Sequence, residues 1–245
     1  MKQIYENYTS SDLEVWNILF TRQIKNLQDK SCNAYLDALS KMDDVLNPNE
    51  LPNFEKINKW FLNHTGWQIQ CVPGLIPVKD FFILLSQKKF PSSTWLRSKD
   101  KLDYLEEPDM FHDIFGHIPL LSDKNYSDFM LEFGKLGFAF LENENYLKAL
   151  QRLYWFAIEF GLIKEDNTTK IYGAGILSSY GESISSIQKI NHHLKFDIEQ
   201  ILVTDFCTSE MQTDYFVMND LLQLNQSIKH VSKKWYVHEL ETGKQ

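Results

Sequence analysis

Two histidines and several carboxylates stand close together in one short, otherwise apolar stretch of this 245-residue chain. The stretch reads Glu107-Pro108-Asp109-Met110-Phe111-His112-Asp113-Ile114-Phe115-Gly116-His117-Ile118-Pro119. Neutral imidazole is the commonest side-chain ligand of divalent transition metals. These residue types therefore predict a metal site that uses His112 and His117.

The spacing of the two histidines places a condition on that site. They are five positions apart, which is about 140° around an ideal α-helix, whereas the zinc-protease pattern separates its histidines by four positions and keeps them on one face. Both could face one ion only if the helix ends or loosens between them, as Gly116 and Pro119 would allow. From spacing alone, an alternative is that one histidine satisfies a helix in the core and the other is exposed.

A third ligand is needed, and Glu159 stands inside the heavily apolar helical segment 153–160. A buried carboxylate must be paired or metal-bound, because an isolated buried charge is strongly unfavourable. The alternative is a polar stripe in which Lys148, Arg152 and Glu159 share one helix face. Two histidines and one carboxylate, without a nearby cysteine, are typical of non-haem Fe(II) oxygenases rather than of structural zinc sites.

Helices are expected to position most of these residues. Ser11 and Glu14 have the form of a capping box, which predicts a helix start, and apolar residues recur at the helical period over 13–27, 32–42 and 54–61. Gly66 is a plausible C-terminal cap. Further helices are expected from about residue 80, from Pro108, over 146–160 and after Asn219-Asp220.

The strands that we expect are few and short. Residues 67–71 alternate with period two, and strand-like pieces follow at 170–172, 195–198, 201–204 and 215–218. The sequence shows no repeat and no linker-like segment. We therefore predict one mainly helical domain with minor β structure that spans residues 1–245.

Composition narrows the possible partners and the compartment. Hydrophobic residues make up 43% of the chain and charged residues 24%, an ordinary globular mixture. The net charge of −8 disfavours nucleic acid and anionic membrane surfaces. Three well-separated cysteines without a CxxC pair fit a reducing compartment. We expect a cytoplasmic protein with no nucleic-acid or membrane partner.

Several motifs follow one another in a recognisable order. The first is Pro108-Asp109-x-x-His112-x-x-x-Gly116-His117-x-Pro119-Leu120. After it come Tyr154-Trp155-Phe156-x-x-Glu159-Phe160-Gly161-Leu162, Tyr172-Gly173-Ala174-Gly175-Ile176-Leu177-Ser178-Ser179-Tyr180-Gly181-Glu182 and Val203-Thr204-Asp205-Phe206. Thr65-Gly66-Trp67 and Val72-Pro73-Gly74-Leu75-Ile76 precede it. Together they cover roughly residues 10–220, and they resemble the pterin-dependent aromatic amino acid hydroxylases, in particular the bacterial members that act on phenylalanine.

The resemblance implies an iron centre. His112, His117 and Glu159 would bind Fe(II) on one face and leave the opposite positions for water and O₂. Ser178 would hydrogen-bond a ligand histidine and fix its ring orientation, an interaction of a kind that matters for metal affinity. The alternative for Ser178 is a hydroxyl that caps the turn after Gly175.

The resemblance also implies a tetrahydropterin cofactor. Phe81 would stack on the pterin ring, and the backbone of Gly74-Leu75-Ile76 would meet its hydrogen-bonding edge, where glycine permits a close approach. Asp113 and Glu182 would contact the pterin side of the iron through water or hydrogen bonds. Without the resemblance, Phe81 would be one core aromatic among 17 phenylalanines.

On the substrate side, the resemblance assigns Arg97 to the amino acid carboxylate, which a planar guanidinium suits. Trp155 and Pro108 would line the slot for the aromatic ring, where Val203 offers no polar group. Taken alone, Arg97 would be a solvated surface charge, and Trp155 and Pro108 would be core packing and a helix start.

The implied reaction is the hydroxylation of L-phenylalanine to L-tyrosine by O₂, with Fe(II) and a tetrahydropterin. Tryptophan or tyrosine hydroxylation by the same family is an alternative. Outside the family, the alternatives are a zinc hydrolase with Asp113 as the water-activating carboxylate, or a non-catalytic helical binding protein. Because no regulatory region or C-terminal heptad repeat is evident, we expect a monomer without regulatory or tetramerisation domains.

Overall fold

The computed structural model describes residues 1–103, 107–188 and 190–242. Helices dominate these residues and strands are few, which confirms the predicted fold class. The α-helices are α1 (Ser10–Leu27), α2 (Asn33–Lys41), α3 (Phe54–Leu62), α4 (Val78–Ser86), α5 (Lys124–Ala139), α6 (Glu144–Leu153), α7 (Ala174–Leu177), α8 (Tyr180–Ser185), α9 (Ile198–Ile201) and α10 (Leu222–Thr242). The short 3-10 or π-helical segments are η1 (Tyr5–Asn7), η2 (Lys99–Lys101), η3 (His112–His117), η4 (Pro119–Ser122) and η5 (Tyr154–Glu159).

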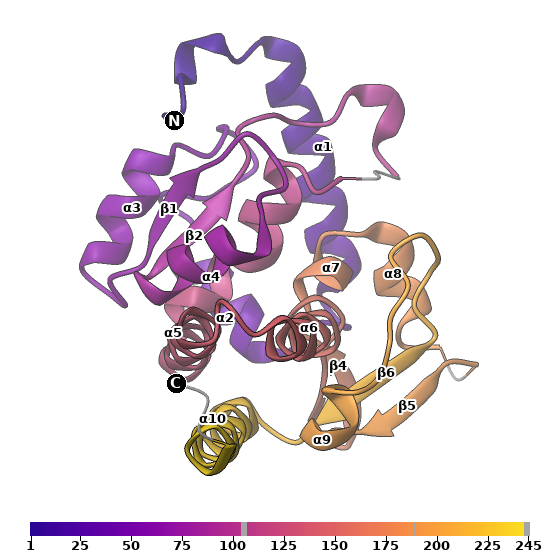
Figure 1. Ribbon diagram of the computed structural model, residues 1–245. Coiled ribbons are helices and arrows are strands. Elements are labelled where there is room, and N and C mark those ends of the chain that lie inside the picture. The colour runs from indigo at the N-terminus through magenta and orange to yellow at the C-terminus, as the bar shows by residue number, and fades with distance from the viewer. Residues whose placement is uncertain (104–106, 189, 243–245) are drawn as a thin grey trace.

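Two small sheets accompany the helices (Figure 1). β1 (Gln68–Cys71) pairs in parallel with β2 (Lys89–Ser92), with Ile69 opposite Phe90. The second sheet has the order β4 (Thr168–Ile171), β3 (Leu162–Glu165), β6 (Asp214–Met218) and β5 (His192–Lys195). The β3–β4 pair is a hairpin, whereas β6 lies parallel to both β3 and β5.

The predicted strands agree with the structure in part. Those near 67–71, 170–172 and 215–218 are confirmed within a few residues, and the strand predicted at 195–198 lies instead at His192–Lys195. The strand predicted at 201–204 is wrong. Residues 198–201 form α9, because the Asp197 carboxylate accepts hydrogen bonds from the backbone N–H groups of Glu199 and Gln200 and caps the helix.

The first helix begins slightly earlier than the sequence indicates. Thr9, not Ser11, forms the capping box, and its partner is the carboxylate of Asp12. α1 then buries its apolar face, and the indole of Trp16 donates a hydrogen bond to the Asn47 carbonyl 2.9 Å away. This bond holds the turn that follows α2 against α1.

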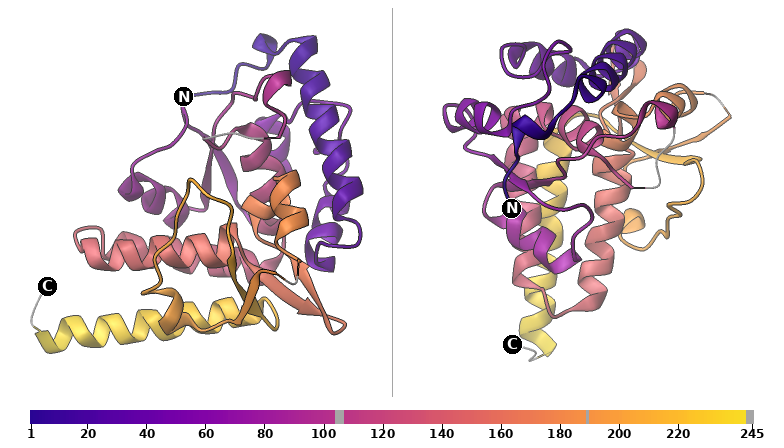
Figure 2. Two further views of the ribbon diagram at one scale, coloured as in Figure 1. Left: turned by 90° about the vertical axis from the view of Figure 1, so that its right-hand side faces the viewer. Right: turned by 90° about the horizontal axis from the view of Figure 1, so that it is seen from above.

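α5 has no counterpart among the expected helices, and it packs between α4 and α10. Figure 2 shows α5 and the yellow α10 running side by side. The Asp123 side chain caps α5 by accepting from the N–H of Tyr126. α4 comes very close at Gly137, where an added Cβ would lie 2.1 Å from the ring of Phe82. The close contact between α4 and α5 therefore requires a glycine, which has no side chain, at position 137.

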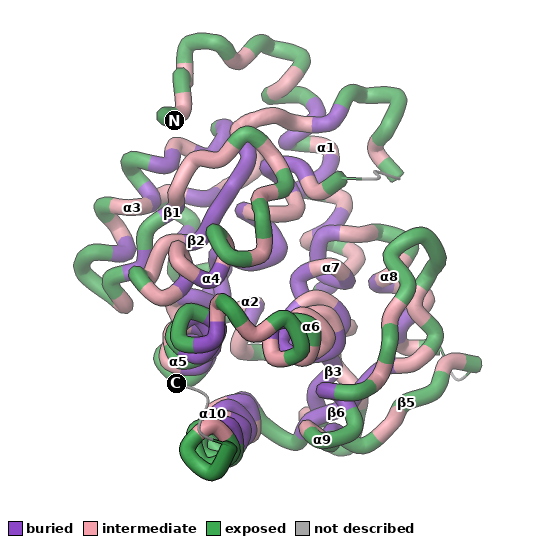
Figure 3. The backbone as a smooth tube through the Cα atoms, viewed as in Figure 1, coloured by how far each residue is buried: buried purple, intermediate pink, exposed green. Residues whose placement is uncertain are grey.

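The segments that carry the predicted metal ligands lie in the interior. η3 and η5 both contact α7, and η3 also contacts β2. Figure 3 shows that β2 and most of α7 are buried. The chain thus brings its chemically active residues to the junction of these segments, far from both termini in sequence.

Candidate active site

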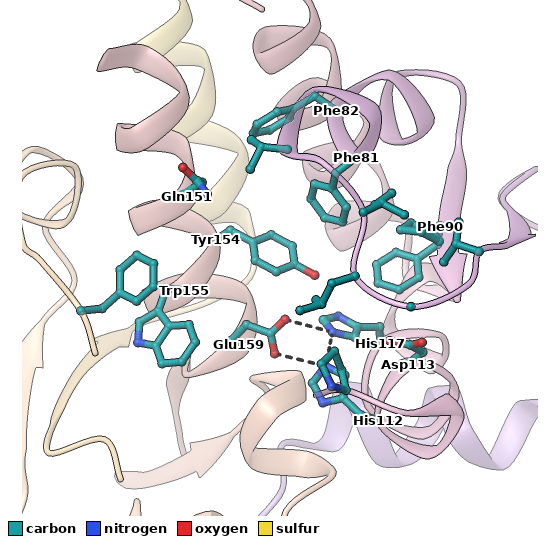
Figure 4. A pocket seen from close by; sticks show the side chains of 18 residues that line it. Phe81, Phe82, Phe90, His112, Asp113, His117, Gln151, Tyr154, Trp155 and Glu159 are labelled. Carbon is teal, nitrogen blue, oxygen red and sulfur yellow. Dashed lines mark hydrogen bonds and ion pairs between the residues drawn. The ribbon is translucent and has the colours of Figure 1, made fainter. Parts of the chain in front are cut away.

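A cavity opens between α4, η3 and η5, and aromatic and aliphatic side chains make up most of its wall (Figure 4). Of the thirteen site residues predicted from the sequence, ten line it: Gly74, Leu75, Ile76, Phe81, Pro108, His112, Asp113, His117, Trp155 and Glu159. Residues as far apart in the sequence as Gly74 and Glu159 therefore line the same cavity.

The five-residue spacing of the histidines is accommodated by a π-helix. Residues His112–His117 form a π-helical turn, in which hydrogen bonds join residues five apart. Residues five apart consequently share a face, and the Nε2 atoms of His112 and His117 lie 3.2 Å from each other. The helix does loosen between the two histidines, as a shared metal site requires.

Glu159 completes the group from a second π-helical turn, at the end of a helix that begins with α6. Its Oε1 lies 3.2 Å from Nε2 of His117, and its Oε2 lies 3.6 Å from Nε2 of His112. Arg152 pairs with Asp205 instead of with Glu159, so the polar-stripe alternative is wrong. Gly175 lies against the carboxylate, where an added Cβ would be 3.1 Å from Oε2 of Glu159.

Ser178 determines which nitrogen of His112 carries the proton. The Ser178 hydroxyl donates its hydrogen to the carbonyl oxygen of Ala174, at 2.8 Å. Its oxygen, 2.9 Å from Nδ1 of His112, must then accept a hydrogen bond from that nitrogen. The lone pair of His112 is consequently on Nε2, the atom that faces His117 and Glu159.

His117 is oriented mainly by packing. It is buried, with the ring of Phe90 at a centroid distance of 4.7 Å and the ring of Tyr154 stacked at 6.0 Å. Its Nδ1 is buried and has no hydrogen-bond partner within the part of the chain that the structure describes. Nε2 is thus the nitrogen that points toward the other two donors.

Burial and neighbouring charges set the protonation of the group. Burial lowers the pKa of His112 to about 4, so its imidazole is neutral near pH 7. Burial alone would raise the pKa of Glu159, but the two imidazoles and the Tyr154 hydroxyl outweigh it and the net pKa is lowered. A neutral imidazole at His112 and an ionised carboxylate at Glu159 suit a divalent cation.

The donor set fits a single metal ion. One nitrogen from each histidine and one carboxylate oxygen lie within 4.8 Å of one another, and the cavity lies beside them. Two imidazoles and one carboxylate on one side of an ion, with open positions on the other, are the ligand arrangement of non-haem Fe(II) oxygenases. His112, His117 and Glu159 therefore fit iron both in chemical type and in position.

Asp113 lines the same cavity but points away from the three donors (Figure 4). Its Oδ2 accepts a hydrogen bond from the backbone N–H of Ser93 at 2.8 Å. Burial raises the pKa of Asp113 to about 7, and the Ser93 bond opposes that shift.

Aromatic residues form two distinct walls. Figure 4 shows Trp155 to the left of Glu159, and Phe81 and Phe90 to the right. Phe206 stacks on Trp155 with ring centroids 4.7 Å apart and an interplanar angle of 13°. Phe81 meets the Tyr154 ring edge-on at 5.1 Å. The two walls could hold two different flat ring systems on opposite sides of the donor group.

Three predicted residues do not line the cavity: Arg97, Ser178 and Glu182. Ser178 contacts Nδ1 of His112 and does not reach the cavity wall. Glu182 accepts a hydrogen bond from the N–H of Gln212 at 3.4 Å, and its Oε2 lies 3.1 Å from the Tyr215 hydroxyl oxygen, so its contact with the pterin side stays a prediction. Val203 is 71% exposed and lies outside the cavity wall, so the ring slot predicted from it must be bounded by other residues.

Arg97 forms a buried ion pair with Asp109. Nε and Nη2 each donate to one carboxylate oxygen of Asp109 at 2.8 Å, and Nη1 donates to the carbonyl of Leu102 at 3.3 Å. A guanidinium has five N–H donors. Within the described residues, these bonds use three of them and leave two for another acceptor.

Two further polar residues support the site and were not predicted. Gln212 accepts a hydrogen bond from the indole of Trp155 at 3.0 Å. Gln23 of α1 is buried and donates to the carbonyl oxygens of Leu177 and Ser179, on either side of Ser178. A buried glutamine on the apolar face of a helix was a signal that sequence reasoning could have used for Gln23, whereas Gln212 offers no comparable signal.

Comparisons with known proteins agree with this geometry. Residues 2–239 match the family described as biopterin-dependent aromatic amino acid hydroxylase. The chain is 43% identical to a phenylalanine-4-hydroxylase of Vibrio cholerae over 86% of this chain and 72% of the relative. It is 40% identical to that of Pseudomonas aeruginosa over 90% and 82%.

Solved structures match as well. The phenylalanine hydroxylase of Chromobacterium violaceum with bound oxidised Fe(III) superposes with a TM-score of 0.92 at 36% identity, over 98% of this chain and 86% of that one. A second structure of that enzyme, with bound iron(III) and the oxidised cofactor 7,8-dihydrobiopterin, gives a TM-score of 0.90 over the same shares and at the same identity.

Proposed function

This chain belongs to the biopterin-dependent aromatic amino acid hydroxylases, and we propose how its residues divide the work of converting L-phenylalanine to L-tyrosine. The protein is a monooxygenase that uses O₂, non-haem Fe(II) and a tetrahydropterin. The observation that carries the proposal is the convergence of His112, His117 and Glu159 beside an aromatic-lined cavity.

His112, His117 and Glu159 would hold the iron through Nε2, Nε2 and a carboxylate oxygen. Bound Fe(II) would activate O₂ and the tetrahydropterin would supply two electrons, so that one oxygen atom is inserted into the para C–H bond of the ring and the other is released as water. Ser178 keeps the His112 proton on Nδ1, so that Nε2 remains free for the metal. Such outer-shell partners orient a ligand and raise its basicity.

The wall formed by Phe81 and residues 74–76 would take the pterin. Phe81 offers a ring face for stacking, and both the phenylalanine and the three-residue segment line the cavity. Asp113 lines the same space and would reach the cofactor through water. Its Ser93 hydrogen bond holds the carboxylate in one orientation.

The wall formed by Trp155, Phe206 and Pro108 would take the phenyl ring of the substrate. Apolar walls exclude water from the reacting carbon, which limits loss of the activated oxygen to side reactions. Arg97, held by Asp109, would bind the substrate carboxylate through the two N–H donors that its other bonds leave available. These residues bind and orient; the cofactors carry the oxidation.

We further propose a cytoplasmic monomer with a single catalytic domain and no nucleic-acid partner. The net charge of −8 and three cysteines without disulfides support the compartment and the lack of nucleic acid. The buried residues of α10, among them Ile228 and Trp235, pack within the same chain. No helix among the described residues is long and apolar enough to cross a membrane. Sedimentation should give one species near 28.9 kDa.

The experiment that tests the function is anaerobic loading with Fe(II), followed by an assay of phenylalanine with tetrahydrobiopterin and O₂. Tyrosine should form only when iron, pterin and O₂ are all present. Protein loaded with Zn(II) is the matched control and should be inactive. Tyrosine formation without pterin, or with zinc alone, would contradict the proposal.

A further inference from the structure

We propose that Gln212 is a positioning residue that sets the orientation of the Trp155 indole in the wall of the substrate ring slot. The inference rests on the proposed function, because it takes the Trp155 wall as the place where the phenyl ring binds. It gives a role to a polar residue on a connecting segment that lies outside the motifs quoted above.

The indole of Trp155 is held at its edge and on its ring. Its Nε1 donates a hydrogen bond to Oε1 of Gln212 at 3.0 Å. Phe206 stacks on the ring at 4.7 Å, and Phe160 lies against it at 4.5 Å with an interplanar angle of 36°. Stacking restrains the tilt of the indole, and the hydrogen bond at one ring edge additionally restrains its movement within the ring plane.

Phe206 and Gln212 are the two ends of one segment that folds over Trp155. The residues between them, 207–211, are all exposed, so they contribute little packing of their own. The segment therefore touches the cavity wall through the stacked ring at its start and the amide at its end.

Gln212 is itself held on several sides. Its Nε2 donates to the carbonyl oxygen of Asp214 at 2.7 Å, which orients the amide so that Oε1 faces the indole. The Tyr215 hydroxyl bonds to the Gln212 carbonyl at 2.8 Å. Glu182 of α8 accepts from the Gln212 N–H at 3.4 Å, and its Oε2 lies 3.1 Å from the Tyr215 hydroxyl, whose single hydrogen goes to the closer Gln212 carbonyl. Glu182 thus acts on the ring slot indirectly, by anchoring Gln212.

The Asp214 carbonyl holds the side-chain amide of Gln212, and Glu182 and Tyr215 hold its backbone, so the residue is expected to be rigid. Loss of the Gln212 side chain would leave the indole N–H without its partner and let the ring turn in its plane. The width of the slot beside the iron would then vary, and the para carbon of the substrate would be held less closely in register. His112 and His117 lie on η3, and Glu159, although it shares η5 with Trp155, makes no hydrogen bond to Gln212 among the described residues, so the iron ligands should not move.

The direct test is the indole N–H resonance of Trp155 in the full chain loaded with diamagnetic Zn(II). Trp155→Phe identifies the resonance, because it removes one of six tryptophans. Gln212→Leu should shift that resonance and leave the other five in place, and Gln200→Leu, at an exposed position on α9, should shift none. An unmoved Trp155 resonance in Gln212→Leu would overturn the inference.

The functional test is a double-mutant cycle in the Fe(II) enzyme with tetrahydrobiopterin. Gln212→Leu should lower kcat/KM for phenylalanine by about 3- to 10-fold, the range of one hydrogen bond, and lower the tyrosine formed per pterin oxidised. In the Trp155→Phe background, which has no indole N–H, the same change should cost less than about twofold.

A purely structural role for Gln212 predicts equal losses in both backgrounds, and that result would overturn the inference. Failure of the wild-type enzyme to make tyrosine would instead contradict the proposed function. The two failures are thus distinguishable, because the resonance of Trp155 does not depend on turnover.

Discussion

The Ser178 hydroxyl lies 2.9 Å from Nδ1 of His112 and donates its own hydrogen to the Ala174 carbonyl. Because the hydroxyl has one hydrogen, it must accept the hydrogen bond from His112. The protonation of an iron ligand is therefore decided by the backbone of α7, which begins at Ala174. Residues that do not contact the metal therefore influence how tightly the site binds it.

Ser178→Ala is expected to weaken Fe(II) binding by about 10- to 100-fold, because His112 loses the partner that fixes its ring and tautomer. Competition with a chromophoric chelator would measure the affinity. Ser209→Ala, at an exposed serine, is the control and should bind iron like the wild type. Wild-type affinity in Ser178→Ala would show that the hydroxyl only caps the turn.

His112→Ala, His117→Ala and Glu159→Ala should each lose bound iron and hydroxylation, because each removes one of three donors. At a hundredfold excess over Kd, metal should stabilise the wild-type fold by about 2.7 kcal/mol and these variants much less. Urea unfolding with and without Fe(II) under anaerobic conditions gives this difference. Arg152→Ala, whose side chain pairs with Asp205, should keep its iron. If one of the three variants keeps both its iron and its turnover, the residue replaced in that variant is not an iron ligand.

Gln23→Leu is expected to destabilise the protein by about 1–3 kcal/mol, since it leaves buried carbonyl oxygens without a donor. Those carbonyls belong to Leu177 and Ser179, so the variant should also bind metal more weakly. Gln28→Leu, at an exposed position just after α1, is the control in denaturant unfolding and metal titration. Equal stability of the two variants would contradict the structural role of Gln23.

Phenylalanine should be preferred over tyrosine by about 5- to 150-fold in kcat/KM, since the slot beside Trp155 and Phe206 is apolar and the tyrosine hydroxyl would lose its hydrogen bonds to water. Trp155→Ala should lower kcat/KM for phenylalanine by at least about 10-fold. Val203→Asp should leave the preference unchanged within about twofold, because Val203 is exposed outside the cavity. A smaller preference for phenylalanine over tyrosine in Val203→Asp would show that residue 203 contacts the ring slot after all.

Much of the chemistry could be predicted from residue types alone. His112, His117 and Glu159 stand in apolar segments, where polar side chains need a reason to be buried. Helical periodicity placed α1, α2 and α3 near their observed positions, because amphipathic helices carry their packing in their sequence. The spacing of the two histidines alone did not distinguish an iron site from a zinc site. The order of the family motifs along the chain did, because it indicated iron together with a pterin.

The tertiary structure decided how those residues meet. The spacing of His112 and His117 conflicts with an α-helix, and only the π-helical turn, packed against α7, brings their Nε2 atoms together. The partner of Arg152 and the exposed position of Val203 depend on how the segment after α9 folds back. Gln212 and Gln23 meet their partners across 57 and 154 positions of chain, respectively. Local sequence encodes the periodicity and the donor types, but contacts between distant segments arise only when the whole core packs, so these contacts leave no local pattern to be read.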